Sequence, residues 1–204
     1  MTFEGKAAPP KPLRMDSDPL CKPEPGATIE ALLVGPNQGL QNVFVYVKDG
    51  LGARTYATPA TPVMLDQKGC QYVPHVFGVQ AGQTVQVSNS DPVIHNVHAI
   101  PQVNREFNLS QPPKVPPAPR VFTTPEVGVL VKCDVHGWMN AYANVVAHPF
   151  FAVTKEDGSF EIKGLPPGSY TLEAWHERLG TQTLAITVDG KSPAKVAMTF
   201  KAAT

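Results

Sequence analysis

Short runs of alternating apolar and polar residues, separated by Gly, Pro and Asn, dominate the chain. In Thr84–Asn89, Val85 and Val87 alternate with polar neighbours, which is the two-residue period of a half-buried strand. Similar β-rich runs are predicted at residues 28–34, 43–47, 62–66, 72–79, 93–99, 127–132 and 141–146. No stretch carries a convincing amphipathic helical period. The pattern therefore predicts an all-β protein.

The first part of the chain predicts an arm followed by a hairpin. Residues 1–27 hold prolines among charged residues and little periodicity, which indicates an extended arm. The runs at 28–34 and 43–47 flank the turn-forming residues 35–39, which is the pattern of a β-hairpin. We expect residues 1–61 to form an arm and a hairpin that pack on the following domain.

Residues 62–147 predict the main β domain. Residues 101–120 are rich in proline and polar residues, so we expect an excursion over the surface. The strands at 127–132 and 141–146 flank one tight loop, and His95 stands on an earlier strand. This arrangement is typical of a Greek-key barrel.

Residues 148–204 have a pattern of their own. Strands are predicted at 151–154, 160–162, 170–175, 183–188 and 194–200, with turns at 155–158 and 165–168. Five short strands at regular spacing predict a small β-sandwich. The seam between the two parts is placed at His148-Pro149.

Composition narrows the class of partner. The 204 residues are 42% hydrophobic and 17% charged, which is ordinary for a globular protein. The 17 basic and 17 acidic residues cancel, so charge gives no indication of binding to nucleic acid or to an anionic membrane surface. The 22 prolines favour short strands and many loops, because proline cannot donate to a sheet ladder.

Targeting signals and cysteines bear on the compartment. No apolar run reaches the length of about 18 residues that a transmembrane helix needs. The start lacks the basic and apolar regions of a signal peptide, so the chain is either cytosolic or a mature domain without its leader. If Cys133 is a metal ligand, Cys21 and Cys70 remain as a pair suited to an oxidising compartment. Two unrelated reduced thiols are an equal alternative.

The candidate chemistry lies in the loop after residue 132. Cys133, His136 and Met139 place a thiolate, an imidazole and a thioether within seven residues, so that one tight loop can turn all three inward. His95 can supply a second imidazole. Two His, one Cys and a weak axial Met form the ligand set of blue-copper centres. A buried inert thiol or a core methionine is the ordinary interpretation of each residue alone, but not of this combination.

Several motifs in residues 62–147 resemble the cupredoxins. His95-Asn96-Val97 is similar to a segment of plastocyanin-type cupredoxins, and the Cys-x-x-His-x-x-Met spacing is similar to that of amicyanin. Tyr72-x-Pro74 and the Val-x-Ala-Gly-x-Thr-Val run at 79–85 add to the resemblance. It implies a Greek-key barrel with one copper ion per chain, cycling between Cu(I) and Cu(II). It also implies electron transfer without bond making, so not an enzyme, with a redox partner such as a c-type cytochrome.

The resemblance implies roles for residues around the ligands. Asn96 is expected to brace the two ligand loops near the Cys133 sulfur. His98 follows His95 by three residues, so in a strand it faces away and is expected outside or behind the ligands. Trp138 is expected to shield the copper, to face a redox partner or to pack in the core.

The axial position has competing candidates. Met139 is the expected axial ligand, with His75 or the carboxylate of Glu106 as alternatives. Convergence of His75 and His98 would create a type 2 copper site and with it an enzyme, but a hydrogen-bonded structural role is the better expectation for His75.

The end of the chain resembles carboxypeptidase regulatory-like or carbohydrate-binding-like sandwich domains, through Asp157-Gly158-Ser159-Phe160 and residues 164–170. Asp18-Pro19-x-Cys21 and residues 66–70 look like parts of a bacterial family that fuses this module to a cupredoxin. That resemblance implies a Cys21–Cys70 disulfide and a periplasmic or extracellular location, with the leader peptide absent from this chain. We infer no sugar binding from it.

The preferred hypothesis is an electron carrier with a mononuclear type 1 copper site. The alternatives are a copper-binding module for sensing, storage or delivery, and a structural surface protein with an incidental metal site. Zinc is a chemical alternative to copper, since Cys and His also bind it. The oligomeric state stays open.

Overall fold

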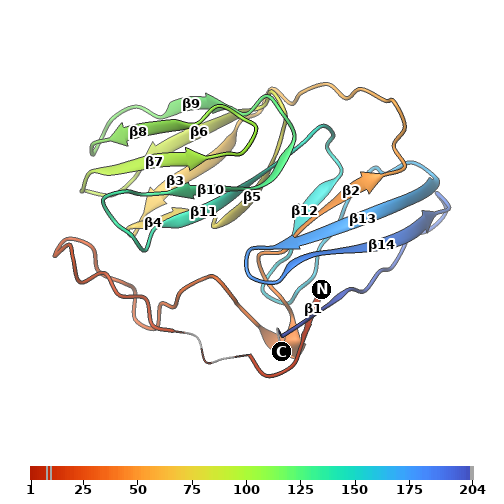
Figure 1. The fold of residues 1–204 in the computed structure, drawn as a ribbon, viewed down its shortest axis with the longest axis horizontal. Helices are drawn as coiled ribbons and strands as arrows, with labels where there is room; N and C mark the ends of the chain where they lie inside the picture. The colour runs from red at the N-terminus through yellow and green to blue at the C-terminus, as the bar shows by residue number, and fades with distance from the viewer. Residues whose placement is uncertain (8, 10, 203–204) are drawn as a thin grey trace. The chain divides into compact units, whose positions relative to one another are not determined.

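A computed structural model describes residues 1–7, 9 and 11–202. Within these residues the regular structure is β, apart from one short 3-10 turn at Pro36–Gln38, and the all-β prediction is confirmed (Figure 1). The described part of the chain contains no helix with the length and apolar character that crossing a membrane requires. Residues 8 and 10 of the predicted arm and 203–204 of the predicted C-terminal sandwich lie outside the described residues.

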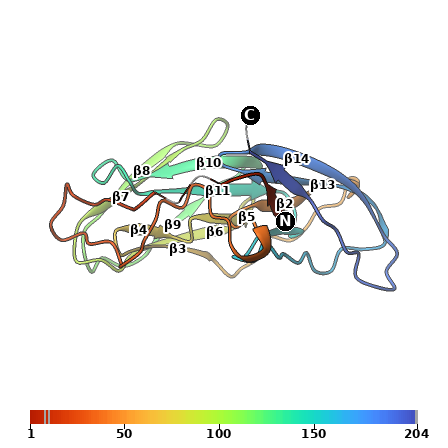
Figure 2. The ribbon, with the colours of Figure 1, turned by 90° about the horizontal axis from the view of Figure 1, so that it is seen from below.

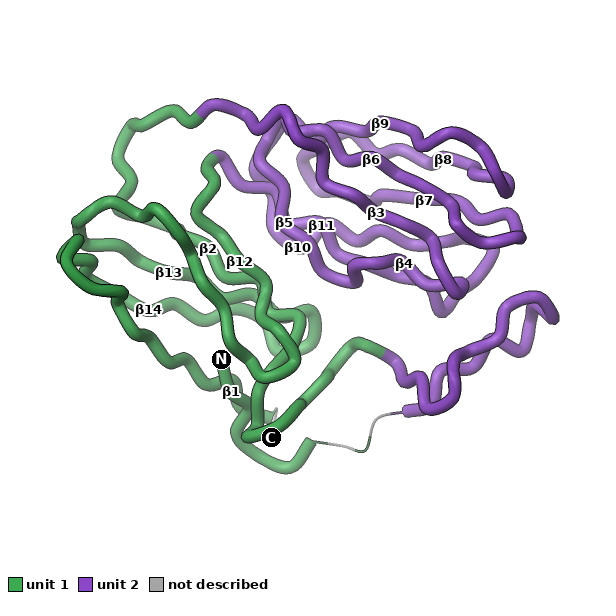
Figure 3. Tube along the Cα trace, turned by 180° about the vertical axis from the view of Figure 1, so that it is seen from behind, with its two compact units in different colours: residues 1–10, 30–56, 148–204 green, residues 11–29, 57–147 purple. Residues whose placement is uncertain are grey.

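The chain forms two compact units that are both discontinuous in sequence (Figure 3). Unit 1 comprises residues 1–10, 30–56 and 148–204, and unit 2 comprises residues 11–29 and 57–147. The chain passes from unit 2 to unit 1 after residue 147, and residues 30–56 also belong to unit 1.

Unit 2 is built from two sheets between which the chain crosses repeatedly (Figures 1 and 2). The four-stranded sheet has the order β4 (Gln71–Val73), β3 (Val63–Lys68), β6 (Thr84–Asn89), β9 (Ala118–Val121). The five-stranded sheet has the order β5 (Val76–Gln80), β11 (Asn140–Val146), β10 (Glu126–Lys132), β7 (His95–Ile100), β8 (Phe107–Gln111). The β3/β6 and β5/β11 pairs are parallel and the other pairs are antiparallel. Unit 2 therefore has the predicted Greek-key arrangement of two β-sheets around one core.

The core of unit 2 follows the alternation seen in the sequence. Val85 and Val87 of β6 are buried while their polar neighbours are partly exposed, and Val97 and Val131 from the other sheet are also buried. Residues 101–120 differ from the expected surface excursion, because they form β8 and β9. Phe107 and its strand pack partly against the core, which gives this proline-rich segment a buried face.

Unit 1 recruits a strand from the first third of the chain. Its main sheet has the order β12 (Phe151–Val153), β2 (Phe44–Asp49), β13 (Gly168–His176), β14 (Gly180–Val188). The short β1 (Thr2–Glu4) pairs in parallel with β15 (Thr199–Lys201). The predicted hairpin is therefore wrong, because β2 gains two long-range antiparallel partners. In residues 28–34 only isolated bridges form, Pro12 to Thr28 and Val34 to Leu40.

The C-terminal sandwich also has fewer strands than the sequence predicts. Residues 160–162 form no strand, although Phe160 and Ile162 pack against the core of unit 1. Gly158 and Gly164 bound this segment with left-handed backbone, at φ values of 75° and 70°, and so turn the chain at both of its ends. Of the strand predicted at 194–200, the structure retains only β15, which begins at Thr199.

Candidate metal centre

The loop between β10 and β11 is closed by its own backbone. Cys133 directly follows β10 and Met139 directly precedes β11. The Cys133 N–H donates to the Met139 carbonyl at 3.1 Å, and the Met139 N–H donates to the His136 carbonyl at 2.9 Å. These two bonds fold the seven residues into one compact turn.

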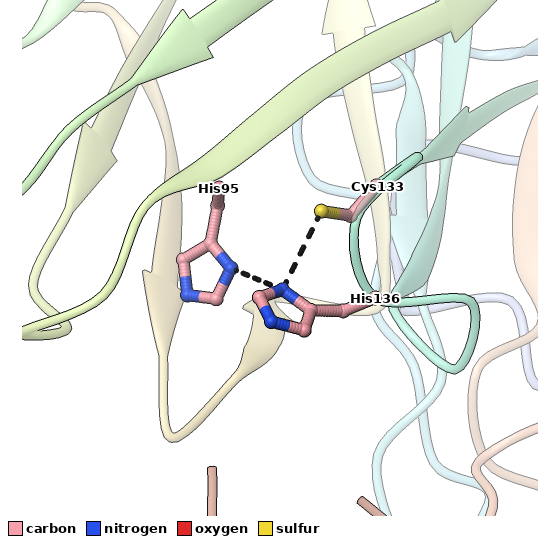
Figure 4. A group of neighbouring side chains, drawn as sticks. All are labelled: His95, Cys133 and His136. Carbon is pink, nitrogen blue, oxygen red and sulfur yellow. Dashed lines mark hydrogen bonds between the residues drawn. The ribbon is translucent and has the colours of Figure 1, made fainter. Parts of the chain in front are cut away.

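The structure brings His95, Cys133 and His136 together (Figure 4). Their ligating atoms lie within 4.8 Å of one another. The two imidazoles face each other with their Nδ1 atoms 2.9 Å apart, and the Cys133 sulfur lies 3.7 Å from the His136 Nδ1. The three residues are 0%, 2% and 1% exposed, so the cluster is closed to bulk water.

This donor set suits a soft or borderline metal ion. Cys133 is the free cysteine of the described residues, since the other two are joined in a disulfide. Burial lowers the pKa of the His95 imidazole, against an opposing effect of Asp91, and so favours the neutral form that binds metals. The two facing Nδ1 atoms can hydrogen bond only through a proton that a bound metal ion would replace.

Asn96 connects the segments that carry His95 and Cys133. Its Oδ1 accepts hydrogen bonds from the Cys133 thiol at 3.3 Å and from the Asp134 N–H at 2.7 Å. The Tyr72 hydroxyl donates to the Asn96 carbonyl, and burial raises the pKa of that hydroxyl. Asn96 thus connects the start of β7 to the start of the loop between β10 and β11.

His98 lies outside the cluster and is held by two carboxylates. Its Nδ1 is 2.9 Å from Asp134 and its Nε2 is 2.9 Å from Glu106. Hydrogen bonds to Glu106 and Asp134 raise the pKa of His98. A hydrogen bond from Lys132, followed by that from His98, holds the pKa of Asp134 well below its usual range.

The remaining candidates have other surroundings. The His75 Nδ1 is 3.1 Å from the Asn140 carbonyl. Within the described residues, the candidate metal clusters include neither His75 nor His98. Met139 is 1% exposed and packs in the same core cluster as Cys133. The Trp138 indole is partly buried, and its ring centroid lies 5.0 Å from that of His136.

Two carboxylates that the sequence analysis did not select complete the surroundings of the cluster. Asp91 lies 2.9 Å from the His95 Nε2, and Asp18 of the arm lies 3.0 Å from the His136 Nε2. The hydrogen bond to His136, followed by one from the Leu20 N–H, lowers the pKa of Asp18. Asp18 stood within a motif noted for its cysteine, and Asp91 within a turn. Neither position carries a local signal of contact with a histidine.

The disulfide that the resemblance implies is formed. Cys21 and Cys70 are joined, with their Cα atoms 5.7 Å apart. Both residues are buried in the core of unit 2, together with Leu13 and Met15 from the arm. The Trp138 indole N–H donates to the Cys70 carbonyl at 2.9 Å, which links the disulfide to the loop between β10 and β11.

A family model matches the C-terminal part of the chain. The model of the ER membrane protein complex subunit 7 β-sandwich domain matches residues 124–204. The match includes β10 and β11 of unit 2 as well as the C-terminal part of unit 1. The matched family is a β-sandwich, as expected, but not the carboxypeptidase regulatory-like domain of the sequence analysis. No curated protein matches the chain.

Among solved structures, similar chains are copper proteins. A copper-containing nitrite reductase from Thermus scotoductus has 22% identity and a TM-score of 0.39, over 46% of this chain and 25% of that chain. Amicyanin from Paracoccus versutus has 19% identity and a TM-score of 0.37, over 50% and 97%. A purple cupredoxin from Nitrosopumilus maritimus has 21% identity and a TM-score of 0.35, over 41% and 99%.

Proposed function

We propose that unit 2 binds one copper ion per chain at His95, Cys133 and His136 and carries single electrons. The observation behind this proposal is the buried cluster of one thiol and two imidazoles, with ligating atoms within 4.8 Å of one another. A thiolate favours Cu(I), and imidazole suits both oxidation states. When bound, the copper ion would supply a one-electron change between Cu(I) and Cu(II).

The surrounding residues suit a carrier whose ligands stay in place. The closed turn of the loop and the hydrogen bonds of Asn96 hold Cys133 and His136 beside the start of β7, which carries His95. Electron transfer is fast when the ligands need not move as the charge changes, and a rigid buried frame limits that movement. The proposed role needs no bond making, so we propose a carrier and not an enzyme.

We propose Met139 as the axial ligand. It closes the loop that holds Cys133 and His136, and it is buried in the same hydrophobic core as Cys133. The competing carboxylate, Glu106, is paired with His98 and has a side chain that is 64% exposed. His75 faces the Asn140 carbonyl.

A redox protein such as a c-type cytochrome is the proposed partner. The Cys21–Cys70 disulfide is compatible with an oxidising compartment, and a bacterial periplasmic or extracellular location is part of the same proposal.

The test is to add Cu(II) to the apoprotein and to record visible and EPR spectra. We expect an intense thiolate-to-copper charge-transfer band that Cys133→Ser abolishes. Met198→Leu, at a buried methionine of unit 1, is the matched control for Met139→Leu: only the second should change the EPR parameters. A colourless, redox-silent protein would reject the carrier and favour zinc. A coloured site that exchanges no electrons with a reduced cytochrome would favour storage or delivery.

A further inference from the structure

Each imidazole of the cluster has a carboxylate at its Nε2 atom, whereas its Nδ1 atom faces the other imidazole. The Nδ1 atoms of His95 and His136 face each other beside the Cys133 sulfur, while both Nε2 atoms face away. The Asp91 carboxylate is hydrogen bonded to the His95 Nε2 at 2.9 Å, and the Asp18 carboxylate is hydrogen bonded to the His136 Nε2 at 3.0 Å. When one ring nitrogen carries the proton and donates a hydrogen bond to a carboxylate, the other ring nitrogen is unprotonated and can bind a metal ion.

The two carboxylates are held to different degrees. Asp91 also accepts the N–H groups of Gly69 and Cys70 at 2.7 and 2.8 Å, and its side chain is 9% exposed. The Asp18 side chain is 24% exposed and accepts the Leu20 N–H at 2.9 Å. Asp91 is therefore part of the rigid unit, whereas the position of Asp18 depends on the arm.

The disulfide joins the two turns that hold these carboxylates. On one side, the Cys70 N–H donates to Asp91. On the other, the Cys21 N–H donates to the Asp18 carbonyl at 3.1 Å, so that cysteine closes the turn that presents Asp18. One covalent bond thus places the arm carboxylate against the metal loop.

We propose that Asp91 and Asp18 are positioning residues of the copper site, and that the Cys21–Cys70 disulfide is what keeps Asp18 in that role. The inference rests on the proposed copper function. Both carboxylates orient an imidazole and make it a stronger donor, which stabilises Cu(II) relative to Cu(I). Together they lower the reduction potential of the site.

The experiment compares Asp91→Asn and Asp18→Asn with Asp66→Asn as a matched control. Asp66 lies in the same unit and accepts hydrogen bonds from the Ser88 and Ser90 hydroxyls. Loss of such a partner weakens metal binding by about 10- to 100-fold. If the affinity for Cu(I) is unchanged, the midpoint potential rises by about 59 mV for each tenfold loss of Cu(II) affinity. Voltammetry and chelator competition measure both quantities, and Asp66→Asn should change neither.

The role of the disulfide is tested by a double-mutant cycle. Cys21→Ala with Cys70→Ala keeps the backbone N–H that binds Asp91 but removes the covalent link between Cys70 and the turn of Asp18. The potential should rise as far as in Asp18→Asn, and adding Asp18→Asn should raise it no further. Fully additive shifts would show that the disulfide does not act through Asp18.

A readout without copper separates this inference from the proposed function. Heteronuclear NMR of the apoprotein should show both Nε2 atoms protonated, with the His136 signal altered in Asp18→Asn and not in Asp66→Asn. A wild-type protein without the charge-transfer band would reject the copper function, whatever the NMR shows. Potentials that stay at the wild-type value in Asp18→Asn and Asp91→Asn, in a protein that does bind copper, would overturn the inference. If Asp91→Asn does not fold, Asp18→Asn on the partly exposed arm decides it alone.

Discussion

Removing the Cys21–Cys70 cross-link is expected to lower the free energy of unfolding of unit 2 by about 4 kcal/mol. The bridge joins residues 49 positions apart, and closing a loop of that length restricts the unfolded chain strongly. In the chain-entropy description the restriction of a loop of about 50 residues amounts to about 4 kcal/mol at room temperature. The native structure keeps most of its packing, because alanine fills much of the volume of each buried cysteine.

The assay is urea denaturation of the Cys21→Ala/Cys70→Ala protein, followed by tryptophan fluorescence. Trp138 lies in unit 2 and Trp175 in unit 1, so a Trp175→Phe background assigns the signal to unit 2. The denaturation midpoint should fall, and reducing the disulfide of the parent protein should reproduce the fall. A loss below about 1 kcal/mol would refute the entropic reasoning, since the arm would then be held by its packing alone.

Two further predictions concern ionic contacts, one in each unit. Because Glu106 and Asp134 raise the pKa of His98, its contribution to stability is complete below the ordinary value of 6.5 and is lost as the pH rises through the raised value. The difference in urea midpoint between the parent and His98→Gln should therefore shrink above pH 6.5, and a difference that grows with pH would contradict the assignment. In unit 1, the Tyr46 hydroxyl donates at 2.6 Å to Glu173, which is 8% exposed, so Tyr46→Phe should cost about 1–3 kcal/mol in chemical denaturation. An unchanged midpoint would mean that water replaces the hydroxyl.

The parts of the site that could be predicted are those that depend on local spacing. Cys133 and His136 are three residues apart in one loop, so their convergence follows from a single turn. His95 could be predicted as a member of the cluster because His95-Asn96-Val97 is a recognisable motif on a predicted strand. Asp18 was not predicted, because it contacts His136 across 118 positions of sequence. A carboxylate that contacts a histidine over that separation leaves no periodic pattern in the sequence.

In the fold as well, the elements that depend on neighbouring residues could be predicted, and the pairing of distant strands could not. Alternation in Thr84–Asn89 located β6, because burial of one face fixes the side on which each residue lies. The same reasoning failed for residues 28–34, whose apolar character suggested a strand beside Phe44–Asp49. Phe44–Asp49 pairs instead with Phe151–Val153 and Gly168–His176. No local pattern in the sequence distinguishes a strand partner that is near in sequence from one that is distant.

The place of β2 in the middle of the unit 1 sheet has a consequence for how the protein is made and handled. Phe44, Val45 and Val47 are at most 1% exposed, yet both neighbouring strands are translated after the whole of unit 2. During translation this strand would have no partner on either side until the later strands are made. Unpaired strand edges of this kind favour aggregation. A fragment ending at Ala147 would keep that liability permanently. A fragment meant to contain unit 2 without this strand therefore has to omit residues 30–56 as well as the residues after Ala147.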